Sequence, residues 1–232
     1  MLEQLKRDVY EACKLLLKYN LVAFAEGNVS GIDRESGLLV IKPEDITYAK
    51  LRIEDLIVVD LQGNKIEGIH KVPADAHAHR VLYKKIKGIS GIVHTHSFWT
   101  ASWAQAGRAI PCYGTIHADY IYGEIPCTRM LTREEILEGY ELNTGRVIVD
   151  NFIKNRQDYI ATPAVLCKNH GLFAWGTDAG NAVRNAYIAE ESAKTAAMCE
   201  VLNPNVRPMS QELQDAYYDQ KNGFDTIYER IS

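Results

Sequence analysis

The chain has 232 residues, of which 47% are hydrophobic and 24% are charged, and these fractions are ordinary for a globular domain. Its 26 basic and 30 acidic side chains give a net charge of −4, so the charge does not favour nucleic acid or an anionic membrane as a partner. Five widely spaced cysteines without a Cys-x-x-Cys pair argue against a disulfide framework and a thiolate zinc site. A charged N-terminus and the lack of an apolar run of membrane-spanning length complete the expectation of a cytoplasmic protein.

The N-terminal part of the chain predicts one amphipathic helix and then a meander of antiparallel strands. Apolar side chains recur every three or four residues between positions 2 and 19, which is the helical period. Residues 24–31 predict a loop, in which Gly27 and Asn28 could approach a small ligand or simply form a turn. Apolar runs predict strands at 38–43 and 56–60, and a third strand that ends near residue 69.

The remainder of the chain mixes helices with short strands. The pattern predicts helices at 75–87, 98–106, 133–141, 144–155, 179–201 and 210–221, strands at 88–96, 164–167 and 172–176, and an irregular segment at 109–130. Thr132 and Glu135 have the spacing of a capping box, and Asp178 is a candidate cap of the longest helix. No internal repeat or linker is visible, so residues 1–232 predict a single α/β domain with a mostly antiparallel central sheet and helices on its faces.

The chemistry centres on His94 and His96, at the end of a predicted strand. Successive side chains of a strand alternate faces, so the two imidazoles point the same way and form half of a metal site. On their own they could equally be two hydrogen-bonded polar residues. Asp75 and His170 come from two further segments and could complete the site, although capping alone also explains an acidic side chain at a helix start.

Five motifs, in order along the chain, resemble the class II aldolase/adducin family, and within it the L-ribulose-5-phosphate 4-epimerase branch. They are Gly27-Asn28-Val29-Ser30, Val93-His94-Thr95-His96, His117-Ala118-Asp119-Tyr120, Ile125-Pro126-Cys127-Thr128-Arg129 and His170-Gly171-x-Phe173-Ala174-Trp175-Gly176. The resemblance runs from end to end of the chain. It implies an α/β/α sandwich around an antiparallel sheet, and a cyclic homotetramer with active sites between neighbouring subunits.

The resemblance also implies a divalent metal. Zinc is the usual ion, and manganese or cobalt would fit the same ligands. The ligands would be His94, His96 and His170, with Asp75 as the nearby acid of the set. His79 matches a family histidine that is expected to support the site without binding the metal. His77 is expected on the helix surface, and a position facing the substrate stays open for it.

Inverting a hydroxyl-bearing carbon that has no carbonyl beside it is difficult, because its C–H proton is not acidic. Cutting and remaking the C3–C4 bond of a ketose avoids this difficulty, with a metal polarising the C2 carbonyl and the C3 hydroxyl as a Lewis acid. The family pattern implies Asp119 and Tyr228 as the two proton-transfer groups, the latter from a neighbouring subunit. Without the resemblance, Asp119 would be an ordinary loop carboxylate and Tyr228 a residue near a chain end.

Departures from the family pattern cluster at the phosphate pocket. Glu44 and Asp45 stand where phosphate-binding members usually carry Ser-Gly, and Ala74 stands in place of a serine. Asn28 and Lys42, which contact phosphate in the family, are present. Other departures are Pro73, Ile116 and Glu26, which replace a serine, a small hydroxyl residue and a tryptophan.

Two carboxylates repel a phosphate dianion, and one close like-charge pair costs a few kcal/mol at an effective dielectric near 20. One interpretation is an unphosphorylated ketose whose hydroxyls bind to Glu44 and Asp45, beside Gly27 and Asn28. The alternative is that both acids face solvent and that Asn28 and Lys42 hold a phosphate with a shifted loop. These two interpretations have similar weight from the sequence.

The leading interpretation is a metal-dependent 4-epimerase of a pentulose or its 5-phosphate, with a retro-aldol and an aldol step. A class II aldolase that releases its aldehyde is the second, although those relatives usually carry Glu at the position of Asp75. A decarboxylase of the same superfamily is the third. A non-enzymatic adducin-like module is disfavoured, because such modules tend to lose the metal histidines.

Overall fold

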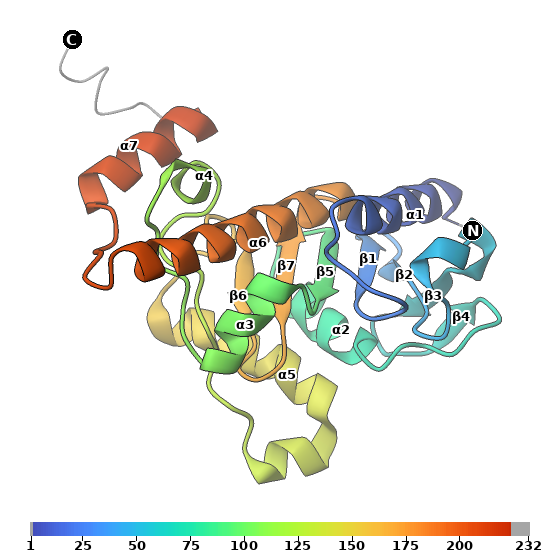
Figure 1. Cartoon of the computed structure of the whole chain (residues 1–232). Helices are drawn as coiled ribbons and strands as arrows, with labels where there is room; N and C mark the ends of the chain where they lie inside the picture. The colour runs from blue at the N-terminus through green and yellow to red at the C-terminus, as the bar shows by residue number, and fades with distance from the viewer. Residues whose placement is uncertain (1, 224–232) are drawn as a thin grey trace.

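The computed structural model describes residues 2–223, and these form a mixed sheet-and-helix body with an antiparallel sheet at its centre (Figure 1). The sheet has seven strands in the order β4-β3-β2-β1-β5-β7-β6, and every neighbouring pair is antiparallel. The strands are β1 (Asn28–Asp33), β2 (Leu38–Ile41), β3 (Ile57–Asp60), β4 (Lys65–Glu67), β5 (Gly91–Thr95), β6 (Ala164–Leu166) and β7 (Leu172–Gly176).

Helices cover both faces of this sheet. They are α1 (Glu3–Lys18), α2 (Ala76–Lys85), α3 (Phe98–Ala106), α4 (Thr115–Ala118), α5 (Arg133–Asn155), α6 (Ala179–Leu202) and α7 (Gln211–Asn222), with short 3-10 turns at Tyr48–Lys50 and Ile53–Asp55. No helix within residues 2–223 is both long and apolar enough to span a lipid bilayer.

Each face of the sheet has its own apolar core, and this makes the architecture the predicted α/β/α sandwich. Val40 packs in a cluster with buried residues of α1 and α6, whereas Leu39 and Ile41 pack in a second cluster with buried residues of α2 and α5. Alternating side chains of one strand therefore enter opposite cores, as the pleat requires. Because both faces are buried, these strands are continuous apolar runs, which is why they were predictable from the sequence.

The prediction of a loop over residues 24–31 is wrong in its second half, because Asn28–Asp33 forms strand β1 in the middle of the sheet. The strand lacks a continuous apolar run, and Gly31 looked like a turn signal. Gly31 instead allows close packing of α1, since a Cβ there would lie 2.8 Å from Leu5 Cδ1 and 3.0 Å from Val9 Cγ2. Tertiary packing therefore explains this glycine.

Two predicted helices, 133–141 and 144–155, form the single element α5, which is interrupted at Gly139 with φ 154° and ψ 103°. The predicted capping box is present, with the Thr132 N–H donating to Glu135 Oε2 at 2.8 Å. The cap at Asp178 is confirmed by the Asn181 N–H, which donates to its carboxylate at 2.7 Å. The segment 109–130, predicted to be irregular, contains the short helix α4.

Candidate active site

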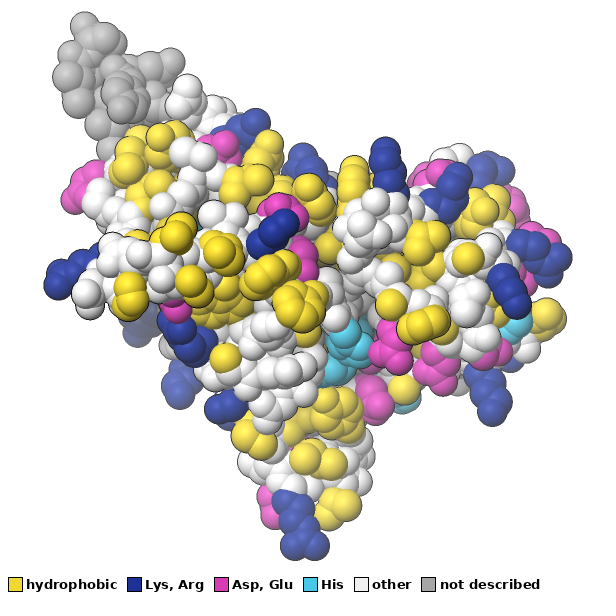
Figure 2. Space-filling view, in the orientation of Figure 1, with side chains coloured by type: hydrophobic (Ala, Val, Ile, Leu, Met, Phe, Trp, Pro, Cys, Tyr) yellow, Lys and Arg dark blue, Asp and Glu magenta, His cyan; other side chains and the backbone are white. Residues whose placement is uncertain are grey.

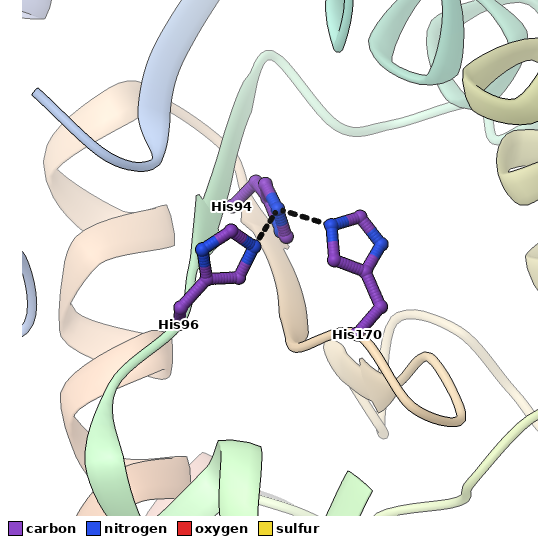
Figure 3. Close-up of side chains that lie close together, drawn as sticks. All are labelled: His94, His96 and His170. Carbon is purple, nitrogen blue, oxygen red and sulfur yellow. Dashed lines mark hydrogen bonds between the residues drawn. The ribbon is translucent and has the colours of Figure 1, made fainter. Parts of the chain in front are cut away.

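Neighbouring strands bring three histidines from two segments together. His94 is the fourth residue of β5, His96 follows that strand, and His170 lies in the turn between β6 and β7. The Nε2 atom of His94 lies 3.0 Å from Nε2 of His96 and 3.1 Å from Nε2 of His170 (Figure 3). One potential ligand atom from each ring lies within 4.8 Å of the others.

The hydrogen bonds on the far side of two rings leave their Nε2 lone pairs facing this common point. His94 Nδ1 donates to the Leu172 carbonyl oxygen at 2.9 Å, and His96 Nδ1 lies 3.0 Å from the Glu26 carboxylate. A neutral imidazole that donates from Nδ1 carries an unprotonated Nε2. Two such lone pairs 3.0 Å apart repel each other unless a cation lies between them, so the donor set fits a divalent metal.

Burial keeps the imidazoles of His94 and His170 neutral. Burial, followed by the neighbouring imidazoles, lowers the pKa of both His94 and His170 to about 3. Neutral imidazole is the form that binds a metal, and three imidazole ligands with an open position suit zinc. His170 Nδ1 is buried and has no hydrogen-bond partner among residues 2–223, so no contact of this nitrogen selects the tautomer of the ring.

Asp75 lies beside this cluster but is outside the group of three histidines. Its carboxylate accepts a hydrogen bond from Asn28 Nδ2 at 2.7 Å and opposes the lowering of the His170 pKa. Although Asp75 is the residue at the start of α2, its side chain makes no capping hydrogen bond. The capping explanation for this acid therefore loses its basis, and its role as a metal ligand stays a prediction.

Gly27 and Asn28 line the site next to His94. Gly27 has φ +74°, and a Cβ there would lie 2.6 Å from the His94 carbonyl oxygen, so only glycine lets the loop pass this strand. Asn28 is paired with His94 in the β1–β5 register and is buried. Its Oδ1 atom has no partner among the described residues.

The two further histidines of α2 differ in environment. His79 is fully buried, its Nδ1 lies 2.7 Å from Ser30 Oγ, and burial lowers its pKa to about 3. Ser30 Oγ also lies 2.8 Å from the hydroxyl of Tyr83. His77 is exposed, and Arg80 lies 3.3 Å from its Nδ1. The exposure of His77 agrees with its predicted surface position, whereas a supporting role for His79 stays a prediction.

Around the predicted phosphate pocket, the charged groups are engaged within the chain. Lys42 is buried, and its Nζ donates to the carbonyl oxygens of Ala25 at 3.2 Å and Pro43 at 2.7 Å. Burial lowers the pKa of Lys42, and the charges of Asp45 and Glu44 oppose this shift.

The two acids are exposed and each has a partner. The Glu44 carboxylate accepts from the Ala74 N–H at 3.3 Å, and the Asp45 carboxylate lies 3.0 Å from His70 Nδ1.

Asp119 lies in a different part of the chain from the histidines. It follows α4, which packs against α6 and α7, and its carbonyl oxygen accepts from Asn222 Nδ2 at 3.2 Å. Figure 1 shows α4 beside α7 at the end of the molecule, and Figure 2, in the same orientation, shows histidine side chains in a central hollow next to acidic ones. The predicted Tyr228 lies outside the described residues.

Two cavities flank the histidine cluster. One of about 400 Å³ is lined by Glu26, His96 and Phe98 among others. The other, of about 210 Å³, is lined by His170, Tyr140 and Lys168 among others. Together they give room for a small polar substrate on either side of the three imidazoles.

Sequence reasoning missed two acids that support this site. Glu26 was noted only as a departure from the family pattern, and its contact with His96 was not expected. Glu190, on α6, is 8% exposed and accepts hydrogen bonds from Ser97 and Thr100 at the start of α3. The alanines at positions 186 and 193, on the same helix face, are a signal that could have indicated its burial.

Comparisons with known proteins agree with this geometry. The family profile described as "Class II Aldolase and Adducin N-terminal domain" matches residues 7–197. The chain belongs to this family. A curated member from Salmonella paratyphi C, L-ribulose-5-phosphate 4-epimerase UlaF, is 43% identical over 227 residues, which cover 98% of this chain and 99% of the relative. A relative of the same name from Salmonella typhi is equally similar.

Solved structures of class II aldolase relatives share the fold. A structure of L-fuculose 1-phosphate aldolase covers 94% of this chain and 96% of its own, with a TM-score of 0.79 and 21% identity. The YgbL protein of Klebsiella pneumoniae has a TM-score of 0.72 and 22% identity, and the match covers 92% of this chain and 98% of YgbL. At these identities the likeness concerns the fold alone, and it confirms the predicted fold class.

Proposed function

We propose that this protein is a metal-dependent ketose 4-epimerase that cleaves and re-forms the C3–C4 bond of its substrate. The convergence of the three Nε2 atoms of His94, His96 and His170 carries the proposal. The near-full-length similarity to curated epimerases makes the chain an enzyme, a carbohydrate epimerase, and adds L-ribulose 5-phosphate as the reference substrate. Retention of all three histidines argues against a non-enzymatic module.

The chain's own residues support a zinc site more than a site for a hard cation, because imidazoles dominate the ligand set. His94, His96 and His170 would hold the ion, with Asp75 close by. A bound divalent ion would act as a Lewis acid toward the ketose carbonyl and the neighbouring hydroxyl. Asn28 holds the Asp75 carboxylate in place, and its unpartnered Oδ1 can accept a hydrogen bond from a substrate hydroxyl.

The reaction needs a base that removes the C4 hydroxyl proton during cleavage. It also needs an acid that returns a proton when the rotated aldehyde adds back to C3. We assign these roles to Asp119 and Tyr228, following the family pattern. Asp119 belongs to the α4–α7 end of the chain, whereas the histidines belong to the end of β5. A neighbouring subunit that supplies the second set would complete each site, so the proposal includes a homotetramer with sites at its interfaces.

The proposed substrate is an unphosphorylated ketose. The Glu44 carboxylate already accepts from the Ala74 N–H, where a phosphate oxygen would otherwise have a donor. The Lys42 ammonium is buried against two carbonyl oxygens and the Tyr48 ring, 4.5 Å from the ring centroid, and these contacts occupy part of its hydrogen-bonding capacity. With Asp45 adding a second negative charge, this pocket disfavours a dianion and favours sugar hydroxyls.

The proposal also keeps the expected cytoplasmic location. All five cysteines are free thiols, and three of them are buried. Unpaired cysteines in this number suit a reducing compartment.

The first experiment is to compare epimerisation of L-ribulose and L-ribulose 5-phosphate by the zinc-loaded protein, with product chromatography. Turnover of the free ketose alone supports both the reaction and the rebuilt pocket. Turnover of the ester alone keeps the reaction and rejects the unphosphorylated substrate. If an aldehyde can be trapped in stoichiometric amount during turnover, the protein is an aldolase and not an epimerase.

The zinc content of His94→Ala is the control. A loss of bound zinc in this variant shows that the unchanged protein holds its zinc at the histidine site.

A further inference from the structure

The exposed acid Glu26 contacts one of the three histidines directly. Its Oε2 atom lies 3.0 Å from His96 Nδ1, and the side chains of Glu26 and His96 are 66% and 35% exposed. A polar contact at such exposure contributes little to folding by itself. Its consequence must therefore be sought in what it does to His96.

The backbone holds Glu26 firmly at this place. The Glu26 N–H donates to the Ala23 carbonyl oxygen at 3.1 Å, and the Ala25 carbonyl oxygen accepts from buried Lys42 at 3.2 Å. On the other side, Gly27 passes so close to His94 that no side chain fits. The loop is tied at both flanks of Glu26, so its backbone keeps the side chain within reach of His96.

His96 has fewer other restraints than His94. The His94 ring is buried, stacks on Phe173 with ring centroids 4.2 Å apart, and donates from Nδ1 to the Leu172 carbonyl oxygen. His96 lies beyond the last residue of β5, and its Nδ1 contact within residues 2–223 is the one to Glu26. A free neutral imidazole can carry its proton on either nitrogen, and the partner of one nitrogen decides which.

We propose that Glu26 is the positioning residue of His96. Its carboxylate accepts the Nδ1–H of His96, which keeps the Nε2 lone pair directed at the point shared with His94 and His170. Glu26 does for His96 what the Leu172 carbonyl does for His94. This inference rests on the proposed metal centre and adds to it a carboxylate that orients one ligand, an arrangement that strengthens metal binding in other sites.

The test is the zinc dissociation constant of the full-length protein, measured by competition with a chromophoric chelator. Glu26→Ala removes the acceptor, Glu26→Gln keeps an oxygen that accepts the Nδ1–H, and Glu35→Gln removes one exposed negative charge between β1 and β2 as a matched control. We expect Glu26→Ala to raise the zinc dissociation constant about 10–100-fold. Glu26→Gln should restore most of the affinity, and Glu35→Gln should match the unchanged protein.

Three results would overturn the inference. The first is Glu26→Ala with the same zinc affinity as Glu35→Gln. The second is Glu26→Gln as weak as Glu26→Ala, because the amide still offers an acceptor. The third is a lower unfolding midpoint for Glu26→Ala than for the unchanged protein when both are metal-free in the presence of a chelator. The weaker zinc binding would then come from a destabilised loop. If the unchanged protein itself fails to bind zinc, the metal centre is wrong, and that outcome is distinct from these three.

Discussion

The carboxylate of Glu190 gives the sharpest test of how the fold holds the site. It reaches from α6 to the start of α3 and accepts four hydrogen bonds: from Ser97 Oγ at 2.8 Å, from the Trp99 N–H at 2.8 Å, and from the N–H and Oγ1 of Thr100 at 2.9 Å each. Ser97 directly follows His96 in the chain. Replacing Glu190 by alanine therefore disturbs both the stability of the fold and the position of one imidazole.

The loss in free energy of unfolding depends on which of the four donors can find another acceptor when Glu190 is replaced by alanine. The two hydroxyls can bond each other, since Ser97 Oγ lies 2.9 Å from Thr100 Oγ1. The backbone N–H groups of Trp99 and Thr100 cannot, and each loses a charge-assisted bond inside the protein. At about 1.5–3 kcal/mol for each such bond, the free energy of unfolding should fall by about 3–6 kcal/mol. For a chain of this size, this corresponds to a fall in Tm of about 6–24 °C.

The assay is urea and thermal unfolding of the metal-free protein, with zinc affinity measured in parallel. Glu191→Ala is the matched control, because Glu191 is the adjacent acid on the same helix and is less buried. Glu190→Gln keeps one acceptor oxygen and should lose less stability than Glu190→Ala, which gives a second measurement if the alanine variant does not fold. Equal free energies of unfolding for Glu190→Ala and Glu191→Ala would refute the reasoning.

Three further predictions concern the pocket and its surroundings. Gly27→Ala should lower the free energy of unfolding by about 1–3 kcal/mol and weaken zinc binding. Gly123→Ala has nearly the same φ but open space around its Cβ, so an equal loss there would remove the clash with His94 as the cause. The pKa of His79 is near 6.5 in the unfolded chain and about 3 in the folded one, so stability should decline as the pH falls from 6.5 toward 3. By pH 5 its share of this loss is about 2 kcal/mol, and urea titrations of His79→Gln should show a flatter pH dependence. The double variant Glu44→Ser, Asp45→Gly should gain kcat/KM on a phosphorylated ketopentose relative to the free sugar, and no gain would contradict the assignment of the pocket.

Local patterns in the sequence were sufficient where the cause of a structure is itself local. The capping box at Thr132 and Glu135 and the buried strands were predictable, because the helical and strand periods repeat over a few residues. The same alternation placed His94 and His96 on one side of the chain, and their Nε2 atoms lie 3.0 Å apart. The distant His170 was a candidate from its residue type, and its role as the third ligand came from the family resemblance, since periodicity says nothing about residues 76 positions away.

Only the tertiary structure decided the features that depend on contacts between distant segments. The sequence predicted a loop at Gly31, yet this residue lies in the central strand β1, where the lack of a side chain lets α1 pack directly against it. Glu26 and Glu190 acquire their roles from partners 70 or more positions away. The separation of Asp119 from the histidines likewise follows from the packing of α4 on α6 and α7. A sequence pattern records how one segment folds locally, whereas the partner of a buried or bridging side chain is set by which segments the sheet order brings together.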